Sequence, residues 1–234
     1  MRTAIMQPYF FPYIGYFQLI NAVDNFVLYD DVTFIKGGWI NRNRILNNNE
    51  SQIFGISLVK ASSNKLIKDI CIIKKDWKKL LKTIKQNYSK APYFEISYNI
   101  IKQISEIKEI ETIADLNYFT IKLICEYAKI DTPIYRSSEL EILEIVEGDR
   151  VGRLVNICKH FNSDTYINAA GGDKLYTKEE FKKNGIDLHF IETTSPAKLY
   201  KQFDGSVPNL SIIDVLMFNN IKELNYLINC YYLR

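Results

Sequence analysis

The first 28 residues constrain the fold most, because two kinds of apolar pattern alternate within them. A short apolar run from Thr3 to Met6 ends in Gln7 and Pro8, and helix-like apolar spacing begins near Gly15. A second short apolar run, Asp24 to Leu28, follows directly. We interpret this order as strand, turn, helix and strand, which is typical of the opening of an α/β fold.

The rest of the chain continues the alternation and adds a helical block. Proline disfavours a helical residue before it, so Pro92 and Pro133 mark boundaries in that block. We predict further strands at 53–59, 65–73, 134–138, 165–168 and 185–192, and helices at 75–88, 94–108, 113–129, 151–161 and 211–230. The expected fold class is α/β, a mostly parallel open sheet with flanking helices and a helical insert in the middle third. The expected parts are 1–74, an N-terminal α/β part, 75–132, the insert, and 133–234, which completes the same domain.

Composition excludes some function classes. With 47% hydrophobic and 24% charged residues in a chain of 234, a substantial core can form. The net charge is only +3 and the lysines are spread along the helices, so we expect no nucleic-acid partner. The 16 tyrosines and 13 phenylalanines fill cores, but side chains of this kind also line sugar and base pockets.

Neither a membrane span nor a cysteine-based site is expected. The apolar stretch at the N-terminus is too short for a signal peptide, and no segment approaches the roughly 20 apolar residues that cross a bilayer. We therefore expect a cytoplasmic protein. Four cysteines lie far apart without a C-x-x-C pair, so neither a disulfide framework nor a metal site is indicated; they are Cys71, Cys125, Cys158 and Cys230.

Polar side chains follow both opening strands. Gln7 follows the first, and Asp30 and Asp31 follow the second. Ligands of open α/β sheets bind outside the carboxyl ends of strands, so we expect these groups at one ligand-binding edge. A carboxylate there would accept a proton from an amine or hydroxyl nucleophile, or fix a sugar hydroxyl. In the alternative interpretation, the prolines and Gly15 only shape a turn, the aromatics are core, and Asp30 caps the next element.

The segment after these carboxylates is rich in basic and amide groups. Lys36 and Arg42 are predicted to bind phosphates or to stabilise developing negative charge. Asn41 and Asn43 offer donors and acceptors that suit sugars, and Trp39 offers a face for stacking. The predicted catalytic residues are Asp30, Asp31, Lys36 and Arg42, and the predicted substrate-binding residues of this region are Gln7, Tyr9, Trp39, Asn41 and Asn43.

A second candidate region follows the strand at 165–168. Gly171 and Gly172 stand between this strand and the next element, a junction whose backbone N–H groups can hold an anion. Arg150 and Arg153, near a helix start, carry forks suited to phosphate oxygens. The equally weighted alternative is a helix capped by Asp149 with solvated arginines. Asp204, Asp214 and Ser211 are candidates for supporting or capping roles.

The two histidines give no clear catalytic signal. His160 and Cys158 are two residues apart on a helix and point to different sides, so they do not form a dyad. His189 lies within a strand, where a core or edge position is the more common role. The sequence leaves open whether either takes part in chemistry.

Four sequence blocks resemble the WbqC-like protein family: QPYFFPYIGYFQLI and DNFVLYDDVTFIKGGWINRN near the start, NYSKAPYF at 87–94 and VPNLSIIDVL at 207–216. The resemblance spans essentially the whole chain. It also covers the small-residue loop before Tyr176, a further candidate for substrate binding, although relatives carry Ser-Gly where this chain has Asn168 and Ala169. Family members are associated with bacterial O-antigen and lipopolysaccharide gene clusters, which implies work on sugars or nucleotide-activated sugars.

Three functions are compatible with these residues and the resemblance. The first is a transferase that moves an acyl or aminoacyl group to the amine of a nucleotide-linked amino sugar, with a small-molecule donor and with ATP as a candidate cofactor. The second is an ATP-dependent ligase or nucleotidylyltransferase-like enzyme that activates a carboxylate, a fold-level analogy. The third is a non-catalytic nucleotide-sugar binding protein of the same pathway. A metal at Asp30 and Asp31 and a homodimer are left open.

Overall fold

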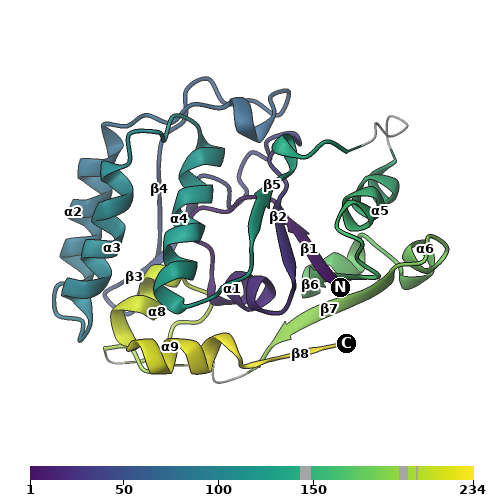
Figure 1. Ribbon diagram of the computed structural model, residues 1–234. Coiled ribbons are helices and arrows are strands. Elements are labelled where there is room, and N and C mark those ends of the chain that lie inside the picture. The colour runs from purple at the N-terminus through teal and green to yellow at the C-terminus, as the bar shows by residue number, and fades with distance from the viewer. Residues whose placement is uncertain (143–148, 195–199, 204) are drawn as a thin grey trace.

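A computed structural model describes residues 1–142, 149–194, 200–203 and 205–234 and contains a six-stranded sheet (Figure 1). Its strand order is β5-β2-β1-β6-β7-β8, in which β8 is antiparallel to β7 and the other neighbours are parallel. The predicted α/β fold with a mostly parallel open sheet is confirmed. The strands are β1 (Arg2–Met6), β2 (Asn25–Leu28), β5 (Ile134–Arg136), β6 (Thr165–Ala169), β7 (Asp187–Thr193) and β8 (Tyr231–Leu233).

The strand order reverses at β1. From β1 the chain proceeds to β2 and β5 on one side, then returns to β6 and β7 on the other side. β1 and β6 are neighbours, and the loops that follow them therefore lead away from each other. A reversal of this kind opens a crevice at the carboxyl ends, where α/β proteins bind ligands.

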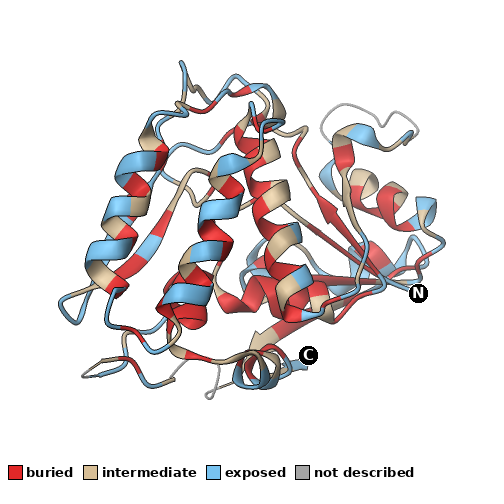
Figure 2. Ribbon diagram, turned by 60° about the vertical axis from the view of Figure 1, so that its left-hand side comes forward, coloured by how far each residue is buried: buried red, intermediate tan, exposed pale blue. Residues whose placement is uncertain are grey.

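Helices cover both faces of the sheet. Alternate residues of β1 and β2 point to opposite faces, so Ala4 and Phe26 belong to one core and Ile5 and Val27 to the other. Figure 2 shows buried residues along the strands and on one side of the helices. The first core includes residues of α1 (Ile14–Asn21), α4 (Ile113–Ala128), α8 (Ile212–Phe218) and α9 (Ile221–Ile228), and the second those of α5 (Arg150–His160) and α6 (Lys178–Lys182).

Three consecutive helices occupy the middle third, as the apolar periodicity predicts. They are α2 (Asp76–Tyr88), α3 (Phe94–Glu106) and α4, and they stand side by side in Figure 1. The apolar stripe of α2 buries Trp77, Leu80 and Ile84. A separate antiparallel hairpin, β3 (Arg42–Asn47) and β4 (Glu50–Gly55), precedes these helices. No helix in the described part of the chain combines the length and apolar character that a membrane crossing requires.

Two predicted elements differ from the structure. The single helix expected at 211–230 is two helices, α8 and α9, followed by β8. Asn220 interrupts it because its side chain accepts hydrogen bonds from the N–H groups of Lys222 (2.9 Å) and Glu223 (3.0 Å), which starts a new helix. Residues 65–73 form isolated bridges and a short 3₁₀ turn, Ile67–Asp69, in place of a strand.

Candidate functional site

A pocket of about 360 Å³ lies at the carboxyl ends of β1, β6 and β7. Three segments that are distant in sequence line it, within 9–14, 39–44 and 209–215. Ala170, directly after β6, the last three residues of β7 and Tyr200 complete the wall. The pocket therefore lies on the side of β1 where the strand order reverses, as the topology of an open α/β sheet leads one to expect.

The aromatic turn between β1 and α1 is held by side chains from the other two segments. Phe11 has φ of 41°, which is rare for a bulky residue and must be fixed by its surroundings. Its carbonyl accepts hydrogen bonds from Asn43 Nδ2 and from Ser211 Oγ, both at 2.8 Å. Asn43 Nδ2 also donates to the Phe10 carbonyl at 3.0 Å. These bonds tie together the three segments that build the pocket.

Aromatic side chains dominate the pocket wall. Tyr9, Tyr13, Trp39 and Tyr200 line it together with Arg44. Burial raises the pKa of Tyr9 and that of Tyr13, and the negative charge of Glu192 raises the pKa of Tyr13 further. Both hydroxyls are therefore protonated at neutral pH and can donate hydrogen bonds to a ligand.

Glu192 contributes a carboxylate to the wall from the end of β7. Its side chain is 26% exposed, and its Oε1 accepts a hydrogen bond from Arg234 Nε at 3.0 Å. Arg234 also donates to Asp173 at 2.6 Å, in the 3₁₀ turn Ala170–Lys174 that follows β6. The guanidinium thus fixes Glu192 relative to the turn that follows the neighbouring strand β6.

A buried carboxylate supports Tyr200 from behind the pocket. Asp214 on α8 is fully buried and accepts hydrogen bonds from Tyr88 (2.8 Å), Gln202 (2.7 Å) and the Tyr200 hydroxyl. Burial raises the pKa of Asp214, and these hydrogen bonds oppose the rise. The supporting role predicted for Asp214 agrees with these contacts. Ser211 caps α8 through a 3.2 Å hydrogen bond from the Ile213 N–H, while Asp204 lies outside the described residues.

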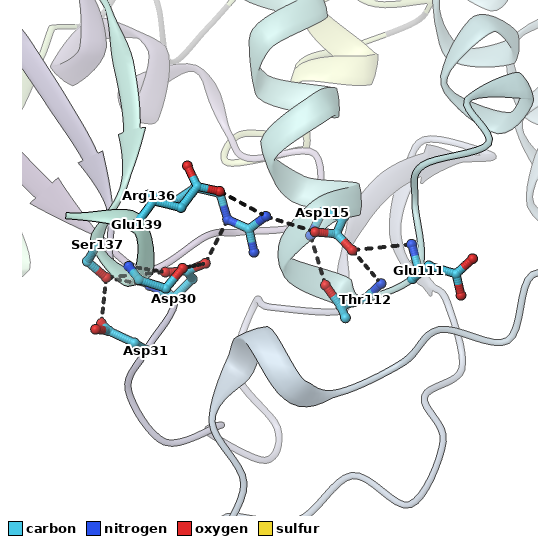
Figure 3. A network of polar contacts seen from close by, with 9 residues as sticks. Asp30, Asp31, Glu111, Thr112, Asp115, Arg136, Ser137 and Glu139 are labelled. Carbon is cyan, nitrogen blue, oxygen red and sulfur yellow. Dashed lines mark hydrogen bonds and ion pairs between the residues drawn. The ribbon is translucent and has the colours of Figure 1, made fainter. Parts of the chain in front are cut away.

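The structure places Asp30 in a separate polar network (Figure 3). Its side chain is 1% exposed and pairs with Arg136 Nε at 2.8 Å. The Ser138 N–H (3.0 Å) and hydroxyl (2.9 Å) also donate to it. Arg136 pairs in addition with Asp115 of α4 at 2.8 Å. This network joins the ends of β2 and β5 to α4, and it leaves Asp30 little capacity to bind a ligand.

Asp31 is linked to the Asp30 network through Ser137 (Figure 3) and to α5 through Arg153. It accepts hydrogen bonds from the Ser137 hydroxyl at 2.5 Å and from Arg153, whose guanidinium lies 5.0 Å from the Tyr29 ring centroid. Burial raises the pKa of Tyr176, and the charge of Arg150 opposes that rise. Neither Arg150 nor Tyr176 is among the described residues that line the pocket.

The other predicted residues of the opening segment have local roles. The Arg42 guanidinium donates to the Gly38 carbonyl at 3.2 Å and to the Gly37 carbonyl, and Asn41 Nδ2 donates to the Ile56 carbonyl at 3.0 Å. Lys36 is exposed in the loop before β3, and Gln7 is half-buried after β1.

Gly171 and Gly172 lie in the 3₁₀ turn after β6, next to Ala170 in the pocket wall. A Cβ at Gly171 would meet nothing within 4 Å, whereas a Cβ at Gly172 would lie 2.4 Å from Asn168 Nδ2. A side chain at position 172 would therefore have to displace the Asn168 side chain. Among the described residues of this turn, only Ala170 lines the pocket.

The structure therefore brings Tyr9, Trp39 and Asn43 together in the pocket and places the other predicted residues elsewhere. His160 is exposed on α5 and His189 is half-buried on β7. Within the described ranges, no group of three His, Cys, Asp or Glu side chains is arranged to hold a metal ion. The pocket residues that sequence reasoning missed are Tyr13, Arg44, Glu192, Tyr200 and Asn209. Glu192 could have been identified from the sequence, because it is the last residue of the predicted strand at 185–192. Gln7 and Asp30 were selected on similar grounds, since each follows a predicted strand.

Comparisons with known proteins agree with the resemblance seen in the sequence. The chain is 26% identical over 231 residues to the uncharacterized protein Rv1507c of Mycobacterium tuberculosis, a match that covers 98% of each chain. No solved structure matches significantly. The pattern of the WbqC-like protein family matches residues 7–226, which include the described segments that line the pocket. The chain belongs to the WbqC-like protein family.

Proposed function

We propose that the pocket binds a nucleotide-linked amino sugar of bacterial surface polysaccharide (O-antigen) synthesis, and that the protein transfers an acyl or aminoacyl group to the sugar amine. One observation carries this proposal: an aromatic pocket at the strand-order reversal is lined by the carboxylate residue Glu192 together with Tyr9 and Tyr13. On this proposal the protein works in the cytoplasm and needs a small-molecule donor.

The wall chemistry suits a sugar. The face of Tyr9 can pack on the C–H face of a pyranose ring, while protonated tyrosine hydroxyls donate to ring substituents. Asn209 is exposed at the pocket wall and offers an amide with both donors and an acceptor.

The chemistry requires one proton acceptor and no protein nucleophile. The neutral amine of the bound sugar attacks the carbonyl carbon of an activated donor, such as a thioester or an acyl adenylate. A C–N bond forms, the C–S or C–O bond of the donor breaks, and the thiolate or the nucleotide phosphate leaves with the electron pair. Glu192 accepts the proton that the amine loses. In this proposal Tyr13 donates a hydrogen bond to the oxyanion that develops on the carbonyl oxygen.

Mass spectrometry tests this function directly. Purified protein is incubated with nucleotide-linked amino sugars and with acyl or aminoacyl thioesters, and in parallel with free acids and ATP. A mass gain equal to one acyl group on the sugar is expected with one donor class. Gain only with free acid and ATP, with AMP released, would favour the ligase hypothesis. Sugar binding without mass gain from any donor would favour the non-catalytic hypothesis.

A further inference from the structure

A guanidinium is stacked on an indole at the wall of the pocket. The Arg44 Cζ atom lies 5.1 Å from the Trp39 ring centroid, and both side chains line the pocket. This is a cation–π contact, in which the cation lies over the face of the indole. The N–H groups of the guanidinium lie in its plane and stay open to a ligand.

Arg44 differs from neighbouring arginines because those are engaged by the protein. Arg42 donates to two glycine carbonyls, and Arg153 pairs with Asp31. Arg136 and Arg234 each bridge two or more carboxylates. The guanidinium of Arg44 has neither an ion pair nor a hydrogen bond with any residue of the described ranges. It is a cation at the pocket with its hydrogen-bonding capacity unused.

The backbone of Arg44 is fixed before any ligand arrives. Its N–H donates to Asn43 Oδ1 at 2.8 Å, and its carbonyl accepts from the Ser211 N–H at 2.8 Å. Arg44 also pairs with Ile53 in the β3–β4 ladder. The exposed side chain of Arg44 thus starts from a backbone that needs no rearrangement on binding.

We infer that the Trp39–Arg44 pair is the anion subsite of the pocket and binds the diphosphate of the nucleotide-linked substrate. The inference rests on the proposed function, since it takes the pocket as the substrate site. A guanidinium presents two parallel N–H groups that match two phosphate oxygens, and the indole holds its plane in place. The carboxylate of Glu192 repels phosphate, so the diphosphate lies at Arg44 and the sugar amine points to Glu192.

Calorimetric titration with UDP and with inorganic pyrophosphate tests this subsite. Wild type should bind both, and Arg44→Gln should weaken both by about tenfold to a hundredfold, as expected for the loss of charged hydrogen bonds. Arg44→Lys keeps the positive charge but loses the paired N–H groups of the guanidinium, so its affinity should lie between those of wild type and Arg44→Gln. Arg150→Gln removes an arginine that the sequence suggested for phosphate binding but that does not line the pocket, and it should bind as wild type does. In a Trp77→Phe background, the emission of Trp39 should change on titration with the same affinity, since the chain has two tryptophans.

Two results would overturn the subsite. Either wild type binds neither probe, or Arg44→Gln binds both probes as tightly as wild type does, whatever the affinity of Arg150→Gln. Weaker binding in Arg44→Gln together with no acyl transfer by wild type would leave the subsite standing and remove the transferase function. Acyl transfer by wild type, together with an unchanged KM for the nucleotide sugar in Arg44→Gln, would support the transferase function and remove the subsite.

Discussion

The side-chain amide of Asn43 lies 2.8 Å from the carbonyl oxygen of Phe11, a residue held at φ of 41°. This contact connects the start of the hairpin to the aromatic turn after β1. Because Phe11 is fully buried, the unusual backbone is maintained by its partners and not by solvent. The shape of the pocket therefore depends on a residue that the sequence indicated only as a possible sugar ligand.

Asn43→Ala should destabilise the protein by about 2–3 kcal/mol, because the buried Phe10 carbonyl loses a donor and the Arg44 N–H loses its acceptor. Urea denaturation measures the change. Asn41→Ala is the matched control, since Asn41 is half-buried and donates one hydrogen bond, to Ile56. Its expected cost is about 1 kcal/mol. Equal effects of the two changes would contradict the special role of Asn43.

Glu192→Gln should lower kcat by about a hundredfold to ten-thousandfold with the fold intact, because glutamine can still accept the Arg234 hydrogen bond but cannot take a proton. Steady-state kinetics of acyl transfer, once a donor is known, gives the value. Glu95→Gln on the exposed face of α3 should leave kcat unchanged. Wild-type turnover in Glu192→Gln would exclude this carboxylate as the proton acceptor.

Asp30→Asn distinguishes a structural from a catalytic carboxylate. Removing its charge leaves the mostly buried Arg136 with one buried partner fewer, so we expect a loss of about 3 kcal/mol in the free energy of unfolding. Chemical denaturation measures it, with the exposed Asp131→Asn as control. Unchanged stability combined with abolished turnover would instead support the catalytic role that the sequence suggested for Asp30.

Asp214 should make the stability of the protein depend on pH. Burial raises its pKa above the ordinary value of 3.8, so its stabilising contribution is complete below 3.8 and is lost as the pH rises through the higher folded-state pKa. Asparagine does not titrate in this range. The stability of wild type relative to Asp214→Asn should therefore fall between acidic and neutral pH in urea denaturation. A difference that rises with pH would show that the hydrogen bonds outweigh burial.

Much of the fold follows from local patterns in the sequence. Apolar runs and helical spacing located most strands and helices, since side-chain direction repeats every two residues in a strand and every 3.6 in a helix. Prediction failed where the hydrogen bonds of a single side chain set the boundary of an element. Asn220 caps the start of α9 in this way and so divides the last predicted helix in two. The hairpin β3–β4 was also missed in part, because its first strand, RNRILN, is largely polar at its start.

The sequence by itself determined that polar groups follow buried strands, and it thereby drew attention to the carboxyl edge of the sheet. Only the tertiary structure decided which of these groups meet. Because β5 pairs with β2, Asp30 faces Arg136 and Ser138 and becomes part of an internal network. Because β6 and β7 lie on the opposite side of β1, Glu192 lines the same pocket as Tyr13. The physical reason is that strand order depends on long-range pairing, which local spacing does not encode.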